Sequence, residues 1–177
     1  MGSFLIFITL DFSFGLNSLK MSQNQNIQIN EEEYIIGLFR NEYPDFPKGK
    51  LLKTESPDFI LKDSAKTAIG IELTKLHGPV SNKDNTPFTS KIRGYQTPEF
   101  TRENIEFTIN AKDVKLPIYK QKMLNQIWLL IIADLIEIPV SFNLSNKLNN
   151  WNFFSGFQRV FLFELKSRKV FELNLSY

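Results

Sequence analysis

The chain has 177 residues, of which 42% are hydrophobic and 23% charged, and this balance is ordinary for one globular domain with a sizeable core. It contains no cysteine and one histidine, His77, which excludes disulfides, thiolate nucleophiles and cysteine-bound or multi-histidine metal sites, and disfavours a serine-histidine-aspartate triad. Net charge is only +2. Chemistry in this protein must therefore rest on carboxylates, lysines and hydroxyls.

We expect residues 1–29 to lie outside the folded domain, either as a disordered segment or because the true start is further downstream. The apolar run Phe4–Ile8 has no basic residue before it and soon meets Asp11. It is also far shorter than the roughly 20 apolar residues of a membrane span. We therefore expect neither a signal peptide nor a membrane anchor, with a weak secretory signal as the alternative. A cytoplasmic protein is the corresponding expectation.

The predicted domain, residues 30–177, opens with a helix. Asn30 is a suitable N-cap, Glu33 occupies the capping-box position, and apolar residues at helical spacing continue to about Asn41. The acids of the first turn also complement the helix dipole. Residues 43–50, with two prolines and a glycine, predict a loop.

Two apolar runs, Phe59–Lys62 and Ile69–Leu73, flank the turn-prone residues 63–67 and predict a β-hairpin. If the turn is centred on Ala65, residues whose numbers add to 130 face each other. Asp58 and Glu72 then become cross-strand neighbours, with Cβ atoms roughly 4.5–5.5 Å apart.

Like charges in this arrangement repel unless a cation lies between them, and a divalent metal is the obvious candidate. Glu72 is the more informative acid because it interrupts a run that otherwise predicts a fully buried strand. Gly70, Glu72 and Thr74 share one face of that strand by alternation. We expect Gly70 to leave room for a ligand beside the carboxylates.

The long segment after the hairpin, residues 77–99, has little apolar periodicity, and we interpret it as a flap over substrate or a disordered insertion. A second helix is predicted from Thr97 to about Val114, with Pro117 kinking or ending it. The lysines that follow form a basic patch, which suits a polyanionic substrate or is simply a solvated helix face: Lys112, Lys115, Lys120 and Lys122.

The run Gln126–Asp134 predicts a buried central strand, and its position after a helix indicates a βαβ crossover with parallel pairing. A short helix is predicted over Leu144–Trp151. The runs Phe157–Leu165 and Lys169–Leu175 alternate around a polar turn and predict a closing hairpin.

These residues resemble a known family. Pro57-Asp58, a hairpin and then Glu72-Leu73-Thr74 resemble the signature of the PD-(D/E)xK nuclease superfamily. The order helix, hairpin, helix, strand, hairpin is similar to its core over most of residues 30–177. The resemblance implies a single α/β domain of the restriction-endonuclease-like fold, a mixed β-sheet flanked by helices.

In that family both acids bind Mg²⁺ or Mn²⁺, and a lysine two residues after the second acid helps to activate or orient water. Thr74 stands at the lysine position here. Lys62, on the Asp58 face of the first strand, and Lys75, on the opposite face from Thr74, are the candidate replacements.

The resemblance implies further contacts. The Leu73 backbone carbonyl and an acid of the first helix, Glu32 or Glu33, are candidate metal ligands. Lys115 followed four residues later by Tyr119 resembles the family's helix motif, and together with Lys112 these side chains would hold a substrate phosphate.

Three hypotheses follow. The first is a Mg²⁺- or Mn²⁺-dependent nuclease that hydrolyses nucleic acid, with DNA favoured and homodimerisation left open. The second is a nuclease-like domain that has lost catalysis and binds nucleic acid or protein, which the threonine at position 74 favours. The third makes Asp58 and Glu72 structural, tied to Lys62 or Lys115 in a buried ion network.

Overall fold

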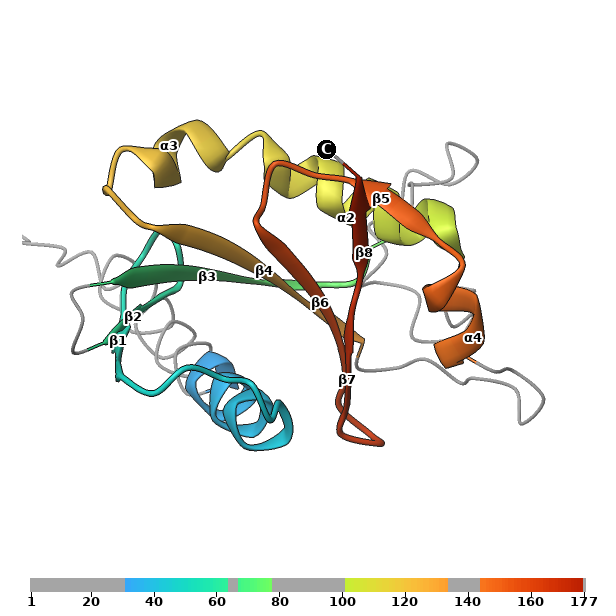
Figure 1. Ribbon diagram of the computed structural model, residues 1–177, viewed down its shortest axis with the longest axis horizontal. Helices are drawn as coiled ribbons and strands as arrows, with labels where there is room; N and C mark the ends of the chain where they lie inside the picture. Colours follow the sequence, from blue (N-terminus) through green and yellow to red (C-terminus); the bar gives the residue numbers. More distant parts are fainter. Residues whose placement is uncertain (1–30, 64–66, 78–100, 134–143, 177) are drawn as a thin grey trace, which may run out of the picture. The chain divides into compact units, whose positions relative to one another are not determined.

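The computed structural model describes residues 31–63, 67–77, 101–133 and 144–176 (Figure 1). The chain divides into two compact units, Met1–Gly37 and Leu38–Tyr177. In the first unit, residues 31–37 are helical, and in the second, residues 38–42 are helical. The predictions for residues 1–29 and for the flap fall outside the described ranges, apart from His77. Among the described helices, none has the length and apolar composition needed to cross a membrane.

The second unit contains a six-stranded mixed sheet with strand order β1-β2-β3-β4-β6-β7. Strands β1 to β3 form an antiparallel meander, β4 and β6 run parallel to β3, and β7 is antiparallel to β6. The predicted α/β class, the parallel crossover and both hairpins are therefore confirmed. The strand bounds are Lys50–Lys53 (β1), Phe59–Lys62 (β2), Ala68–Lys75 (β3), Gln126–Ala133 (β4), Arg159–Glu164 (β6) and Lys169–Glu172 (β7).

The remaining elements are three helices and a small sheet. Strands β5 and β8 pair in parallel as a separate two-stranded sheet, which the sequence did not predict. The predicted short helix is confirmed as α4. The bounds are Arg102–Asp113 (α2), Leu116–Lys120 (α3), Leu144–Asn149 (α4), Asn152–Phe154 (β5) and Asn174–Ser176 (β8).

The start predicted for the second helix is wrong. Thr101 has an extended backbone and its side chain accepts a hydrogen bond from the Asn104 amide, so it is the N-cap of α2. Pro117 does end the predicted continuous helix, but it lies in the first turn of α3, where its missing N–H costs nothing. The predicted loop over residues 43–50 ends one residue early, because Lys50 begins β1.

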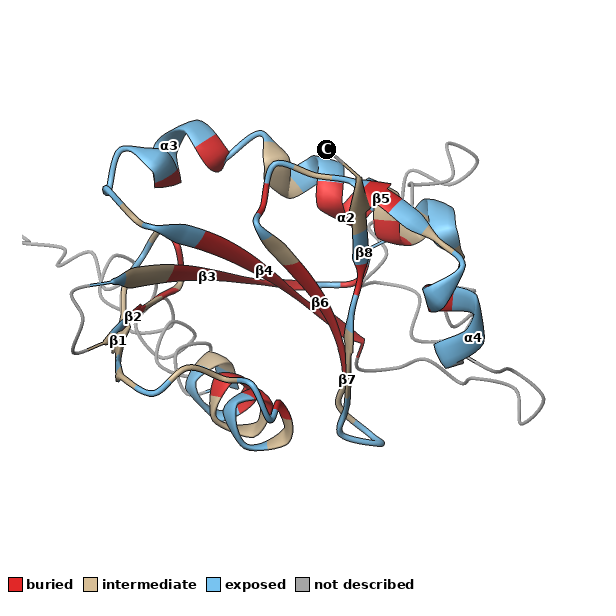
Figure 2. Cartoon of the chain, in the orientation of Figure 1, coloured by how far each residue is buried: buried red, intermediate tan, exposed pale blue. Residues whose placement is uncertain are grey.

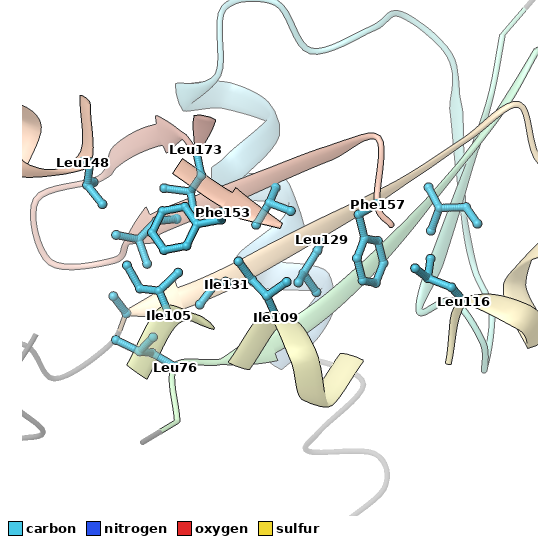
Figure 3. Packing of buried hydrophobic residues seen from close by; sticks show 14 of the residues in the cluster. Leu76, Ile105, Ile109, Leu116, Leu129, Ile131, Leu148, Phe153, Phe157 and Leu173 are labelled. Atoms are coloured by element: carbon cyan, nitrogen blue, oxygen red, sulfur yellow. The ribbon is translucent and has the colours of Figure 1, made fainter. Parts of the chain in front are cut away.

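Alternation along β4 and β6 gives the sheet two apolar faces (Figure 2). On one face, Leu129 and Ile131 pack in a single cluster with helix residues Ile109 and Leu116 (Figure 3). On the other face, aromatic rings pack together, with ring centroids 5.2 Å apart for Phe39 and Phe161. Strand β3 lies between β2 and β4, so its side chains on the α2 face sit beneath the helices.

Candidate functional site

The β2–β3 register agrees with the predicted one. Phe59 pairs with Ile71 and Ile60 with Gly70, so continuing the ladder by one residue sets Asp58 opposite Glu72. The Asp58 carboxylate accepts a hydrogen bond from the Leu73 amide, with 2.7 Å between Oδ2 and N. Glu72 is 3% exposed. A buried carboxylate therefore lies beside a second one that is held by the β3 backbone.

Two lysines of the crossover compensate the charge of Glu72. Lys112 Nζ lies 2.8 Å from Glu72 Oε1, and Lys115 Nζ lies 3.6 Å from the same oxygen. The Lys112 side chain is 18% exposed and that of Lys115 is 49% exposed. Lys112 therefore makes the shorter and better shielded contact.

Tyr119 contributes the third crossover group. The residue is completely buried, and its hydroxyl makes no hydrogen bond of good geometry with the described residues, although the Glu72 and Ser56 side chains are close enough to shift its pKa. Burial raises the pKa of this hydroxyl, and the nearby charges of Glu72 and Asp58 raise it further. Tyr119 is therefore a protonated donor at neutral pH, and it lies in the field of both carboxylates.

Helix geometry explains why these three side chains meet. Lys112, Lys115 and Tyr119 are three and four residues apart, which is the spacing of one helix face. The Tyr119 amide donates to the Lys115 carbonyl at 3.3 Å, so the turn that joins them survives the adjacent Pro117. Leu116, also buried, anchors the start of α3 in the core.

Neither of the two predicted replacements for the motif lysine, Lys62 and Lys75, is buried beside Glu72. Thr74 is buried and follows Glu72 on the same face of β3 by alternation. Lys75 is exposed and projects from the opposite face, and Lys62 is exposed at the far end of β2. Among the described residues, Lys112 and Lys115 form ion pairs with Glu72.

The expectation that Gly70 leaves room for a ligand is wrong. A Cβ atom added there would lie 2.6 Å from Leu124 Cδ1 and 2.7 Å from Pro57 Cγ. The space over Gly70 is therefore filled by side chains of the chain itself. Gly70 instead permits the close packing of Pro57, the residue that precedes Asp58.

The carboxylate pair suits a small divalent cation. Mg²⁺ retains several waters and commonly needs one or two protein carboxylates. Asp58 and Glu72 supply that number, while no group of three or more histidine or acidic side chains gathers in the described part of the chain. Leu73, whose backbone carbonyl was a further predicted ligand, lies within β3, and its amide donates to Asp58. Glu33, the remaining predicted ligand, is exposed on the helical residues of the first unit.

His77 follows β3, and its backbone is hydrogen-bonded to α2. Its amide donates to Thr108 Oγ1 at 2.9 Å. The pKa of His77 is lowered by burial and by the positive charges of Lys112 and Lys75, which favours a neutral imidazole. Sequence reasoning missed this link between β3 and α2, although a buried threonine in the apolar stripe of a helix was a signal for it.

Comparison of the chain with protein-family models, with curated proteins and with solved structures found no match.

Proposed function

We propose that this protein is a metal-dependent nuclease of the restriction-endonuclease-like fold that hydrolyses phosphodiester bonds in nucleic acid, with DNA favoured. One observation carries the proposal. A buried Glu72 faces Asp58 across two antiparallel strands, and Lys112 from the following crossover helix contacts Glu72 at 2.8 Å. The order of meander, crossover helix and parallel strand supports it further.

Asp58 and Glu72 would hold Mg²⁺ or Mn²⁺ through carboxylate oxygens. When bound, such a cation supplies two effects, a lower pKa for an attacking water and neutralisation of charge on the phosphate oxygens. The Leu73 amide keeps the Asp58 carboxylate in position by its hydrogen bond. The lysine pair balances the negative charge of the buried Glu72 carboxylate.

Lys112 takes the role that the family assigns to the motif lysine. The hydroxyl at Thr74 cannot supply a positive charge, whereas the Lys112 ammonium lies at the carboxylate from the facing helix. Lys115 is the more exposed lysine and is better placed to meet a substrate phosphate. Tyr119 was predicted as a phosphate contact but is completely buried, so its hydroxyl would steady the neighbouring Glu72 carboxylate and not contact the phosphate directly.

A second candidate function is a nuclease-like domain that binds nucleic acid or protein without cleaving it. The double contact of Lys112 and Lys115 with one Glu72 oxygen favours this alternative, because two ammonium groups already compensate the buried carboxylate without a metal. The same contact supports a purely structural ion network. A cytoplasmic location and a homodimer stay predictions in every case.

The test is a nuclease assay on the purified full chain. Supercoiled plasmid and single-stranded DNA are incubated with Mg²⁺ or Mn²⁺, using wild type, Asp58→Asn, Lys112→Met and the control Asp45→Asn. Asp45 is exposed and lies outside the site. We expect metal-dependent cleavage by wild type and Asp45→Asn, and a loss of about 100-fold or more in the other two variants.

The outcomes separate the hypotheses. Absence of cleavage by folded wild type, with Asp58-dependent metal binding in calorimetry, would overturn the nuclease and favour the binding domain. Absence of both cleavage and metal binding would leave the ion network as the role of the pair. Undiminished cleavage by Asp58→Asn would reject the site itself.

A further inference from the structure

A second charged feature lies on the β1–β2 hairpin. Lys50 and Lys62 are directly paired across the two strands, and both are exposed. Alternation along β2 places Lys62 on the same face as Asp58. Paired residues share a face, so Lys50 lies there too. Like charges directly opposite each other destabilise a sheet. The hairpin therefore carries a repulsion on the face that bears the carboxylate pair.

The described part of the chain offers no side-chain partner that would offset this repulsion. Within the described ranges, the side chains of Lys50 and Lys62 form no hydrogen bond or ion pair. The one acid next to them in sequence, Asp63, is engaged by the Thr67 amide at 2.9 Å. The paired lysines therefore repel each other without a stabilising partner in the described part of the chain. Binding of an external anion between them would remove this repulsion.

The segment after α3 brings more positive charge to the same end of the sheet. Asn125 is held to Ala68 by two hydrogen bonds, of 2.8 Å from its amide and 2.7 Å to its side-chain oxygen. Ala68 is the cross-strand partner of Lys62. Lys122, exposed and three residues before Asn125, therefore lies on a segment that ends beside the lysine pair.

Acids of the crossover do not cancel this charge. Asp113 accepts hydrogen bonds from Ser155 Oγ at 3.0 Å and from the Gly156 amide at 3.3 Å. These contacts tie Asp113 to the segment before β6. Lysines lie at both ends of this part of the sheet. Lys115 is at the carboxylate pair, and Lys122 is on the segment that leads to the Lys50–Lys62 pair.

The separation between the carboxylate pair and the Lys50–Lys62 pair suits a polymeric ligand. Ala68 and Glu72 are four residues apart on β3, which is about 13 Å along the strand. If the axis of a bound duplex runs along β3, that length corresponds to about four base pairs. A mononucleotide at Glu72 is too short to reach Lys62.

We propose that Lys50 and Lys62, assisted by Lys122, form a second phosphate-binding subsite that holds a polynucleotide about 13 Å to one side of the carboxylate pair. This inference rests on the proposed function. It narrows the substrate class to nucleic acids longer than a few nucleotides and gives the bound strand a defined path across the β2–β3 face.

The first test measures binding without cleavage. Fluorescence anisotropy with a labelled 20-nucleotide single strand and the matching duplex is recorded in EDTA at several salt concentrations. The variants are Lys50→Gln/Lys62→Gln and the charge-matched control Lys166→Gln/Lys169→Gln, both of whose lysines are exposed near the β6–β7 turn. For the duplex, we expect the first variant to lose about tenfold or more in affinity and to lower the salt slope by about 2, and the control to change little.

The second test separates this subsite from the proposed function. With metal present, the Lys50→Gln/Lys62→Gln variant should hydrolyse bis(4-nitrophenyl) phosphate like wild type but lose turnover on the oligonucleotide through a higher KM. Equal binding losses in the two double variants would overturn the subsite. Selective loss of binding with no hydrolysis by wild type would retain the subsite and reject the nuclease. Urea unfolding checks the fold, and removal of the repulsion should leave stability unchanged or raised.

Discussion

Tyr119 carries a hydroxyl in a position where it costs stability. The group is fully buried and makes no hydrogen bond of good geometry with the described residues, while the rest of the ring packs in the core cluster. A buried polar group without a partner costs about 1–3 kcal/mol. A fold that retains this group beside two carboxylates is expected to use it when substrate or water is bound.

We predict opposite effects of Tyr119→Phe on stability and activity. Removal of this buried hydroxyl, which makes no hydrogen bond of good geometry, should raise the free energy of unfolding by about 1 kcal/mol, and loss of its interaction with Glu72 should lower kcat about tenfold. Urea unfolding and the plasmid assay measure the two effects. Tyr43→Phe is the matched control, since the Tyr43 hydroxyl accepts a hydrogen bond from Arg159 and its loss should destabilise without affecting kcat. Destabilisation by both variants would assign the Tyr119 hydroxyl a structural role.

The sequence predicted the two carboxylates and, as one alternative, their contact with Lys115, but it did not predict the shorter contact of Lys112 with Glu72. Asp58 and Glu72 lie on neighbouring strands joined by a short turn, so alternation and turn position were enough to pair them. Lys112 is 40 residues from Glu72, and its contact depends on how the crossover helix packs on the sheet. Local patterns carry no information about that packing, so Lys112 was predicted only as a phosphate contact.

At the scale of elements, side chains from two neighbouring segments pack over Gly70 in the β2–β3 hairpin. Pro57 and Leu124 both approach Gly70, one from the entry to β2 and the other from the segment that leads into β4. The Leu124 side chain can adjust, but the Pro57 ring cannot move without its neighbour Asp58. The packing at Gly70 therefore sets the position of one carboxylate relative to the other.

We predict that Gly70→Ala lowers both stability and activity. Its Cβ would lie within 2.7 Å of the Pro57 ring, and such overpacking typically costs about 1–3 kcal/mol. Displacement of Asp58 should also reduce cleavage by protein that is still folded. Urea unfolding and the nuclease assay at low temperature test these effects. Gly37→Ala is the control, because its added Cβ meets nothing within 4 Å. A fully active and stable Gly70→Ala variant would show that the Pro57 and Leu124 side chains can move to make room for the added Cβ atom.

Element prediction succeeded where the apolar pattern was continuous and failed where it was short. Strand β4, buried along nearly all of its length, and strand β6 were predicted close to their observed bounds. The second strand of the closing hairpin was predicted to reach Leu175 but ends at Glu172, because the chain continues into β8, which pairs with β5. Strand β1 was missed because its four residues begin and end with lysine. Strands β5 and β8 have three residues each and pair over a long separation in sequence, so neither has a local signal.

At the scale of the whole molecule, a divalent cation that binds the carboxylate pair must stabilise the folded chain. Ligands that bind only the native state add stability in proportion to the logarithm of their concentration. The site exists only when β2 and β3 are paired, so binding is linked to folding of the sheet. This linkage gives a readout of the metal that does not need catalysis.

We predict that Mg²⁺ or Mn²⁺ at about 100 times its Kd raises the Tm by about 5–10 °C, which corresponds to about 2.7 kcal/mol. Asp58→Asn should abolish most of the shift, and Asp45→Asn should retain it. Differential scanning calorimetry with a titration of each ion measures the effect. An equal shift in wild type and Asp58→Asn would place cation binding elsewhere.

The wide separation in sequence between Glu72 and its lysine has a consequence for the order of folding. Closure of the short β2–β3 turn brings Asp58 and Glu72 together early, but Lys112 arrives only when the crossover helix has docked. Until then the hairpin holds two like charges, with the Leu73 amide donating to Asp58 but neither lysine at Glu72, so we expect it not to be a stable intermediate. Hairpin and crossover should consequently pass the folding barrier in one step, and substitutions in either should slow refolding together.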